Sequence, residues 1–283
     1  QMLLQSLVFA SLVGLSSQAF SDATARNLFL PIAAAAYSDN PQACLTRVIS
    51  GKVSKQLTEK IEHFTDKGSG FTFYSTSKKV VGLSFRGTSN TAQLVSEVTQ
   101  TGFESKVPFQ DGGSVSKYFN DAFTKLWNDG LGADLQSLIK KYPGYELWIT
   151  GHSLGAALAS LAAAHIAANN IYDGSKIVLY TFGQPRIGDQ TYANEHDKLV
   201  PNAFRVTHNR DIVVHVPPEA MKYVHHETEV FYLENMGPSA PYSICKGQED
   251  KACSDEFDFD TSVDDHTHYY EVDISSYGEA GCQ

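Results

Sequence analysis

The chain has 283 residues, of which 42% are hydrophobic, and it carries a formal net charge of −10 at pH 7. An α/β chain of this length often forms one domain and buries about three quarters of its unfolded surface, so one large core is expected. The 22 lysines and arginines form no cluster. This excludes a basic nucleic-acid-binding patch and argues against tight binding to an anionic membrane.

The N-terminal residues QMLLQSLVFASLVGLSSQA have the pattern of a secretory signal peptide. Residues 3–15 are apolar, and the small residues Ser17 and Ala19 have the spacing of a cleavage site. The stretch is too short to span a bilayer comfortably. Because no lysine or arginine precedes it, a membrane-associated or packed N-terminal helix is the alternative. We expect residues 1–19 to be removed and residues 20–283 to be secreted as a single domain.

The hydrophobic pattern after the signal peptide predicts strands and helices that alternate through the middle of the chain. The predicted helices cover 22–39, 115–144 and 154–170. The predicted strands lie within 70–87, 145–150, 176–183, 203–218 and 227–234. Such alternation favours an α/β sheet with helices on its faces. The last forty residues are acidic and have the composition of loops.

The chain contains four cysteines, an even number that is typical of disulfides in a secreted protein. Three connectivities are possible. Cys245 and Cys253 enclose a short polar loop, CKGQEDKAC, so we expect them to pair with each other and Cys44 to pair with Cys282. The alternative is four buried free thiols. A zinc site is disfavoured because no Cys-x-x-Cys or His-x-x-x-His spacing occurs.

Residues 151–155 read GHSLG, between a predicted strand and a predicted helix. A Gly-x-Ser-x-Gly sequence alone is weak evidence, but this position is the one that a nucleophile elbow requires. Gly151 and Gly155 would let neighbouring backbone pass close to the sharp turn. The Leu154 N–H would point at the charge that develops on an attacked carbonyl. We expect Ser153 to be a nucleophile, and the alternative is an ordinary turn serine.

A serine nucleophile needs a base, and in such hydrolases an acid and then a histidine follow it along the chain. Asp211 lies just beyond a predicted strand, where α/β enzymes place functional groups. The alternative for Asp211 is a plain turn residue. The histidines that could follow it are His215, His225, His226, His266 and His268.

Six segments occur in the order that is seen in fungal-type (class 3) lipases, a family that includes triacylglycerol lipases and feruloyl esterases. They are LSFRGT (83–88), ITGHSLGAALASLAA (149–163), LYTFGQPRIGD (179–189), FRVTHNRDIVVHVPP (204–218), YVHHETEVFY (223–232) and DHTHYY (265–270). The resemblance spans residues 28–282. It implies an α/β-hydrolase fold with a mostly parallel central sheet and helices on both faces.

The resemblance also implies roles for individual residues. The nucleophile of the family falls on Ser153 and its acid on Asp211. Its histidine begins an H-x-x-Y-(F/Y) motif, which falls on His266 rather than on His268. The disulfide pairing that we expect is similar to that of the family.

Further parts of the family pattern surround the nucleophile. The oxyanion donors fall on Thr88 and on the backbone N–H of Leu154. Residues 89–110 occupy the place of the lid, and their apolar residues at 94, 95, 98 and 103 lie close to helical spacing. The asparagine–tryptophan pair that many lipases carry there is absent, since residues 90–92 read Asn-Thr-Ala.

We therefore expect a secreted serine carboxylic-ester hydrolase that acts on triacylglycerol or other acylglycerol lipids through an acyl-enzyme. One alternative is a feruloyl or other soluble-ester esterase on the same scaffold. Another is a lipid-binding homologue that has lost catalysis. We expect no cofactor, no metal and no nucleic-acid partner. Residues 89–110 are the expected contact with a lipid interface.

Overall fold

The computed structural model describes residues 18–61, 67–88, 105–110, 112–257 and 261–283. Nearly all of the predicted signal peptide and residues 89–104 of the predicted lid lie outside the described residues. In the described part, no helix has the length and the apolar character that crossing a bilayer needs.

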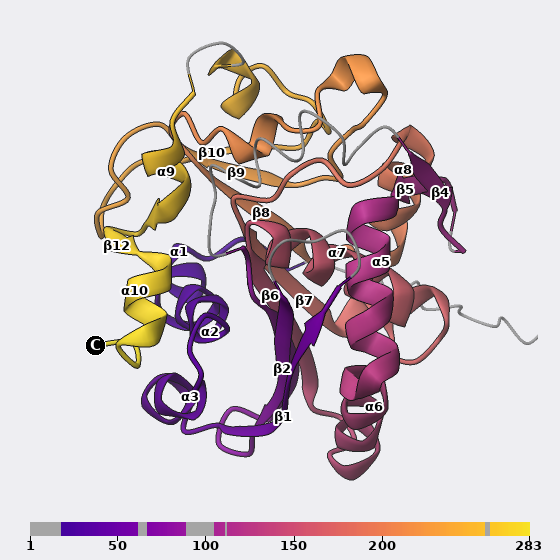
Figure 1. Ribbon diagram of the computed structural model, residues 1–283. Helices are drawn as coiled ribbons and strands as arrows, with labels where there is room; N and C mark the ends of the chain where they lie inside the picture. Colours follow the sequence, from indigo (N-terminus) through magenta and orange to yellow (C-terminus); the bar gives the residue numbers. More distant parts are fainter. Residues whose placement is uncertain (1–17, 62–66, 89–104, 111, 258–260) are drawn as a thin grey trace, which may run out of the picture.

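An eight-stranded sheet forms the centre of the fold (Figure 1). Its strands, in spatial order, are β1 (Lys52–Lys60), β2 (Lys67–Ser75), β3 (Val80–Phe85), β6 (Glu146–His152), β7 (Ile177–Phe182), β8 (Ala203–His208), β9 (Glu229–Tyr232) and β10 (Ser243–Cys245). Strands β3, β6, β7, β8 and β9 are parallel, and β1, β2 and β10 continue the sheet in antiparallel pairs. The carboxyl ends of the parallel strands meet at one edge, where Ser153 follows β6 and Asp211 lies three residues beyond β8.

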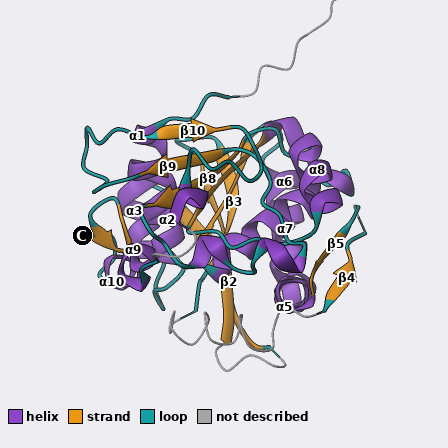
Figure 2. Cartoon of the chain, turned by 90° about the horizontal axis from the view of Figure 1, so that it is seen from above, coloured by secondary structure: helices purple, strands orange, loops and turns teal. Residues whose placement is uncertain are grey.

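Both faces of the sheet are covered because its central strands are apolar on both sides. Along β3, Val81 and Leu83 belong to one core cluster and Val80 to the other, as the alternation of side chains in a strand requires. Figures 1 and 2 show the helices that cover the two faces. One face carries α5 (Lys117–Leu126), α6 (Gly132–Lys141), α7 (Leu154–Ala168) and α8 (Gln190–Leu199); the other carries α2 (Leu30–Ala35), α3 (Gln42–Ile49) and α10 (Ile274–Glu279).

The remaining elements are short. They are α1 (Asp22–Thr24), the π-helical turns η1 (Ala25–Phe29) and η3 (Trp127–Leu131), the pair β4 (Lys106–Pro108) and β5 (Ser114–Ser116), the 3₁₀ turns η4 (Gly174–Lys176), η5 (Val213–His215), η6 (Glu219–Met221) and η7 (Ser254–Phe257), then α9 (Val263–Thr267) and the pair β11 (His268–Tyr269) and β12 (Val272–Asp273). Strand β4 includes residues that we had assigned to the end of the lid, and it pairs with β5 rather than continuing a helix.

Most of the predicted elements are confirmed, and three expectations need correction. The helix predicted over 115–144 is interrupted at Gly130, whose φ of 135° is not helical. The strand predicted over 203–218 ends at His208, and residues 213–215 form a 3₁₀ turn instead. Helix α10 lies in the C-terminal region for which only loops were expected.

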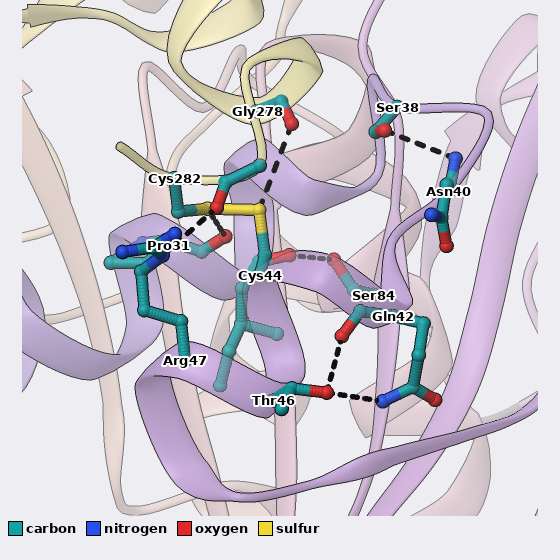
Figure 3. The surroundings of a disulfide bond; sticks show 12 residues. Pro31, Ser38, Asn40, Gln42, Cys44, Thr46, Arg47, Ser84, Gly278 and Cys282 are labelled. Atoms are coloured by element: carbon teal, nitrogen blue, oxygen red, sulfur yellow. Dashed lines mark hydrogen bonds between the residues drawn. A yellow bond between two sulfur atoms is a disulfide. The ribbon is translucent and has the colours of Figure 1, made fainter.

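Two disulfides are present, Cys44–Cys282 and Cys245–Cys253, and both predicted pairings are confirmed. Figure 3 shows Cys44 on α3 bonded to Cys282, which follows α10, with Gly278 and Pro31 beside the sulfur atoms. This bond ties the C-terminal segment to the helical layer on one face of the sheet.

Candidate active site

Ser153 lies at a strained turn between β6 and α7. Its backbone angles are φ 61° and ψ −130°, which a residue with a side chain rarely adopts. A Cβ at Gly151 would collide with the carbonyl of Gly155, and one at Gly155 would collide with the carbonyl of Phe85. The turn can therefore be this tight only with glycine at both positions. This is the geometry of a nucleophile elbow.

The side chains of Ser153 and His266 are buried, but the reactive atom of each has no hydrogen-bond partner among the described residues. Ser153 is 1% exposed and His266 is fully buried. Among the described residues, the Oγ of Ser153 and the Nε2 of His266 have no hydrogen-bond partner. Buried polar atoms are nearly always paired, so two unpaired ones at a strained turn point to a chemical role.

Asp211 and His266 form a close pair. The Nδ1–H of His266 donates to both carboxylate oxygens of Asp211, at 2.8 and 2.9 Å. A β-bridge between Asp211 and Ser262 joins the segment after β8 to the segment that leads into α9. Two elements that are 55 residues apart in the chain are thereby held side by side.

Asp211 receives two further hydrogen bonds. The hydroxyl of Tyr269 donates to Oδ2 at 2.6 Å, and the backbone N–H of Val213 donates to Oδ1 at 2.7 Å. Burial by itself would raise the pKa of Asp211, but the charge of His266 and these hydrogen bonds hold the pKa below its ordinary value. The carboxylate therefore stays ionised beside the imidazole. Sequence reasoning missed Tyr269, although it is the tyrosine of the H-x-x-Y motif.

Gly183 makes room for this pair. It follows β7 with a φ of 57°, and a Cβ there would lie 2.8 Å from Asp211 Oδ2 and from the ring of His266. Contacts below 3.0 Å are not tolerated by real Cβ atoms. Any larger residue would force Asp211 or His266 to shift.

One predicted oxyanion donor directly follows Ser153, and the other follows a glycine that lies against Ser153. The N–H of Leu154 opens α7, a helix of 15 residues whose N-terminus favours negative charge. Thr88 follows Gly87, and a Cβ on Gly87 would lie 3.0 Å from the Cβ of Ser153. The Oγ1 of Thr88 is buried, and it has no hydrogen-bond partner within the described part of the chain.

Comparison with known proteins supports the same chemistry. Residues 82–221 match the family described as lipase (class 3). A lipase of Caenorhabditis elegans is 30% identical over an alignment of 296 residues, which covers 92% of this chain and 82% of that protein. The chain belongs to the class 3 lipase family. It is accordingly a serine ester hydrolase.

Solved structures of lipases have the same fold. A lipase from Rhizopus microsporus var. chinensis is 30% identical and superposes with a TM-score of 0.75, over 87% of this chain and 86% of that one. A triacylglycerol lipase described as having a serine-protease triad at its catalytic centre is 27% identical with a TM-score of 0.77, over 87% of this chain and 93% of that one. The architecture of this lipase is therefore the α/β-hydrolase fold.

Two of the other candidate histidines of the lipase have different partners. His268, the alternative base, is half-exposed, and its Nδ1 lies 3.0 Å from the carbonyl of Asp264. His225 Nε2 lies 2.8 Å from the carbonyl of Val214. The structure therefore brings His266, and neither of these two, to Asp211.

Two clusters in the described residues have donor atoms that lie within 4.8 Å of one another, as a metal site requires. The first contains His196, Asp197 and His226, but the two rings are stacked at 3.7 Å and 17°, so their in-plane lone pairs cannot meet at one ion. The second contains Glu219, Glu249 and Asp255. There the guanidinium of Arg186 already binds Glu249 and Asp255, at 2.8 and 3.1 Å.

Proposed function

We propose that this lipase hydrolyses carboxylic esters with Ser153 as nucleophile, His266 as general base and Asp211 as the acid that orients it. The observation that supports the proposal is the hydrogen bonding of the His266 ring. His266 donates its Nδ1–H to a buried carboxylate, while its Nε2 and the Oγ of Ser153 have no hydrogen-bond partner in the described residues. The neutral imidazole is thus fixed in the tautomer whose free lone pair is on Nε2.

The reaction follows from these groups. His266 Nε2 takes the proton of Ser153 as Oγ attacks the ester carbonyl, and Asp211 stabilises the imidazolium that forms. The Leu154 N–H and Thr88 stabilise the negative charge on the carbonyl oxygen, and one such donor contributes about 3 kcal/mol. The tetrahedral intermediate then expels the alcohol, which takes the proton from His266. Water, deprotonated by His266, attacks the acyl-enzyme, and His266 returns this proton to Ser153 Oγ as the carboxylic acid leaves.

Covalent labelling tests the nucleophile. A fluorophosphonate probe should label the wild-type enzyme and should not label Ser153→Ala. Ser160→Ala is the matched control, because Ser160 is a second buried serine on α7. Failure to label the wild-type enzyme, or label retained in Ser153→Ala, would overturn the assignment.

We propose acylglycerols as the substrates, which is supported by the triacylglycerol lipase among the structural relatives. Nitrophenyl esters of increasing chain length, measured below and above the concentration at which they form micelles, test this choice. A lipase should show a rise in rate at the interface and a preference for long chains. A preference for short, dissolved esters would instead support the soluble-ester alternative.

Two parts of the proposal concern segments that lie mostly outside the described residues. We propose that residues 1–19 are a signal peptide and that 89–110 contact the lipid interface. Mass spectrometry of the exported protein should find Phe20 at the N-terminus, and retention of the leader would contradict the first part. Exchange of the apolar residues at 94, 95, 98 and 103 for serine should abolish the rise in rate at the interface, and an unchanged rise would contradict the second.

A further inference from the structure

Tyr37, His152 and the backbone of His266 form a chain of hydrogen bonds behind the proposed catalytic residues. The hydroxyl of Tyr37 lies 2.7 Å from His152 Nδ1, and His152 Nε2 lies 2.8 Å from the carbonyl oxygen of His266. The contacts join residues that are 115 and 114 positions apart in the chain. Tyr37 follows α2, His152 ends β6 next to the nucleophile, and His266 lies in α9.

The chemistry of these atoms determines which proton lies where. A backbone carbonyl can only accept, so His152 must carry its proton on Nε2 and donate it to His266. In the neutral ring Nδ1 is then an acceptor, and the Tyr37 hydroxyl must donate to it. Every polar atom of the His152 ring thus has one fixed partner.

His152 stays neutral in this position. Burial and the neighbouring His266 lower the pKa of His152 to about 3, against the weaker opposing effects of its hydrogen bond and of the carboxylates Asp211 and Asp273. The aromatic groups against its ring are Tyr37, His266 and Tyr269, at centroid distances of 5.9, 4.5 and 5.9 Å. His152 therefore keeps the same hydrogen-bonding pattern across the neutral and mildly acidic range, and it is not a second base.

The result is that His266 is held at three places. Its carbonyl accepts from His152, its ring stacks on the ring of His152 at 4.5 Å and 28°, and its Nδ1 binds Asp211. Within the described part of the chain, Nε2 of this ring has no hydrogen-bond partner, and it is the atom that must meet the hydroxyl of Ser153. His152 immediately precedes Ser153 in the chain, so the side chain that contacts the proposed base comes from the residue next to the proposed nucleophile.

Tyr37 also contacts the loop that carries Thr88, the proposed oxyanion donor. A Cβ on Gly87 would collide with the Tyr37 hydroxyl and would lie 2.9 Å from the carbonyl of His152. Gly87 directly precedes Thr88, so the Tyr37 hydroxyl lies between the loop that carries one proposed oxyanion donor and the elbow.

We infer that His152, fixed in one tautomer by Tyr37, is a positioning residue that aims Nε2 of His266 at Ser153. This inference rests on the proposed function, because it assigns a role relative to the proposed base. It is specific in that His152 should act on the proton transfer alone and through His266 alone.

Steady-state kinetics test the first consequence. Misplacing a reacting group by about 1 Å can cost about 100-fold in rate, so His152→Leu should lower kcat by about 10- to 100-fold with little change in KM. His152→Gln should recover part of the loss, because its terminal amide can still donate to the His266 carbonyl. Tyr37→Phe should lower kcat less, by a few-fold. Tyr192→Phe, which removes another buried tyrosine hydroxyl bonded to a side chain, is the matched control and should leave kcat unchanged.

A double-mutant cycle tests the second consequence. In a His266→Ala background, His152→Leu should cause no further loss of the residual hydrolysis of an activated nitrophenyl ester, because residues that act as one unit are not additive. A role in holding the elbow or the oxyanion loop predicts an equal further loss in that background, and this result would overturn the inference. So would a His152→Leu enzyme with wild-type kcat.

The outcomes also separate the inference from the function on which it rests. If fluorophosphonate labels wild-type Ser153 and His266→Ala is inactive, but the His152 variants retain full kcat, the inference alone is wrong. If wild-type Ser153 is not labelled, the proposed function itself is wrong.

Discussion

Two buried serines lie along α7, one directly before its first residue and one within it, each near a buried histidine, and only one of them has the surroundings of a nucleophile. Ser153, the residue before the helix, lies at the strained elbow, and its Oγ has no hydrogen-bond partner among the residues that the structure describes. Ser160, two turns further on, has its Oγ 3.0 Å from His196 Nε2 and 3.3 Å from the hydroxyl of Tyr192. Both serines are fully or almost fully buried, so burial does not separate them.

The two sites differ in the hydrogen bonding of Nδ1, the other ring nitrogen of each histidine. His266 gives its Nδ1–H to Asp211. The Nδ1 of His196 has no hydrogen-bond partner in the described part of the chain, and the adjacent Asp197 accepts instead from the Glu227 N–H and from Gln248. Burial lowers the pKa of His196 to about 3, opposed by its hydrogen bond with Ser160 and, among the described residues, by no carboxylate bonded to the ring. A serine beside a histidine is therefore structural unless a carboxylate stabilises the imidazolium and the serine itself is left open.

The strongest test of this comparison is to remove each hydroxyl in turn. Ser153→Ala should lower kcat about a million-fold, as expected for the loss of a nucleophile. Ser160→Ala should leave kcat within about three-fold of wild type, because it removes only hydrogen bonds inside the helical layer. The measurement is hydrolysis of a nitrophenyl ester by purified, folded protein. Comparable losses from both substitutions would mean that the two sites are not functionally distinct.

Gly183→Ala tests whether kcat depends on the contact between Asp211 and His266. The added Cβ would lie 2.8 Å from both side chains, so we expect kcat to fall about 10- to 100-fold through misplacement of the base. Gly144→Ala is the matched control, because Gly144 has a positive φ of 81° but nothing within 4 Å of its Cβ position. The two variants share a backbone cost of about 1 kcal/mol in the free energy of unfolding. Only Gly183→Ala should lose activity, and equal kcat values in the two variants would contradict this account.

The sequence predicts those parts of the site that depend on local patterns. The elbow is contained in five residues between an apolar strand and a small-residue helix, and Asp211 follows a strand end in the expected chain order. The choice between His266 and His268 needed the family resemblance, because the two lie only two residues apart. Tyr37 and Tyr269 escaped prediction because their hydrogen bonds to the site cross 115 and 58 residues, which no local pattern records.

The fold predictions likewise succeeded where the local sequence pattern is clear and failed where it is weak or overridden. Strands β3 and β7 are buried along their whole length and read as continuous apolar runs, so they could be predicted. Strand β1 is half-exposed at the edge of the sheet, and its sequence KVSKQLTEK alternates too weakly to be recognised. The mostly apolar residues 212–216, IVVHV, read as a strand, but the Val213 N–H donates to Asp211 and the chain turns there. A hydrogen bond to the carboxylate of Asp211 thus accompanies a turn where the local propensity favours a strand.

Tyr269→Phe measures what the environment of the acid contributes. The variant loses the hydroxyl that donates to Asp211 Oδ2, and a hydrogen bond to a charged group contributes about 1.5–3 kcal/mol. We expect kcat to fall about ten-fold and the free energy of unfolding to fall by about 2 kcal/mol. Tyr270→Phe, next in the chain, loses only a 3.4 Å contact with the hydroxyl of Tyr232 and should retain wild-type kcat. An unchanged kcat in Tyr269→Phe would show that the other contacts of Asp211 are sufficient to orient His266.

The smallest expected effect on activity concerns Ser160 and His196, the pair that we regard as structural. Here the effect appears in the free energy of unfolding. Below the ordinary imidazole pKa of about 6.5, the unfolded chain binds a proton at His196, while the folded chain resists protonation until the pH approaches about 3. The contribution of His196 is therefore fully present above pH 6.5 and is lost as the pH falls through this window, by at most about 1.4 kcal/mol per pH unit.

His196→Gln should make this acid dependence shallower, because glutamine can still donate to Ser160 but cannot be protonated. The measurement is urea unfolding at a series of pH values from about 7.5 down to about 4.5, with His268→Gln as the control, since His268 is half-exposed and lies outside the helical layer. At the upper end of the series His196→Gln should have the kcat of wild type, whereas any variant of His266 should not. If His196→Gln retains the full acid dependence, protonation of other buried groups governs acid unfolding. If it loses activity, the division between a catalytic and a structural serine–histidine pair on α7 is wrong.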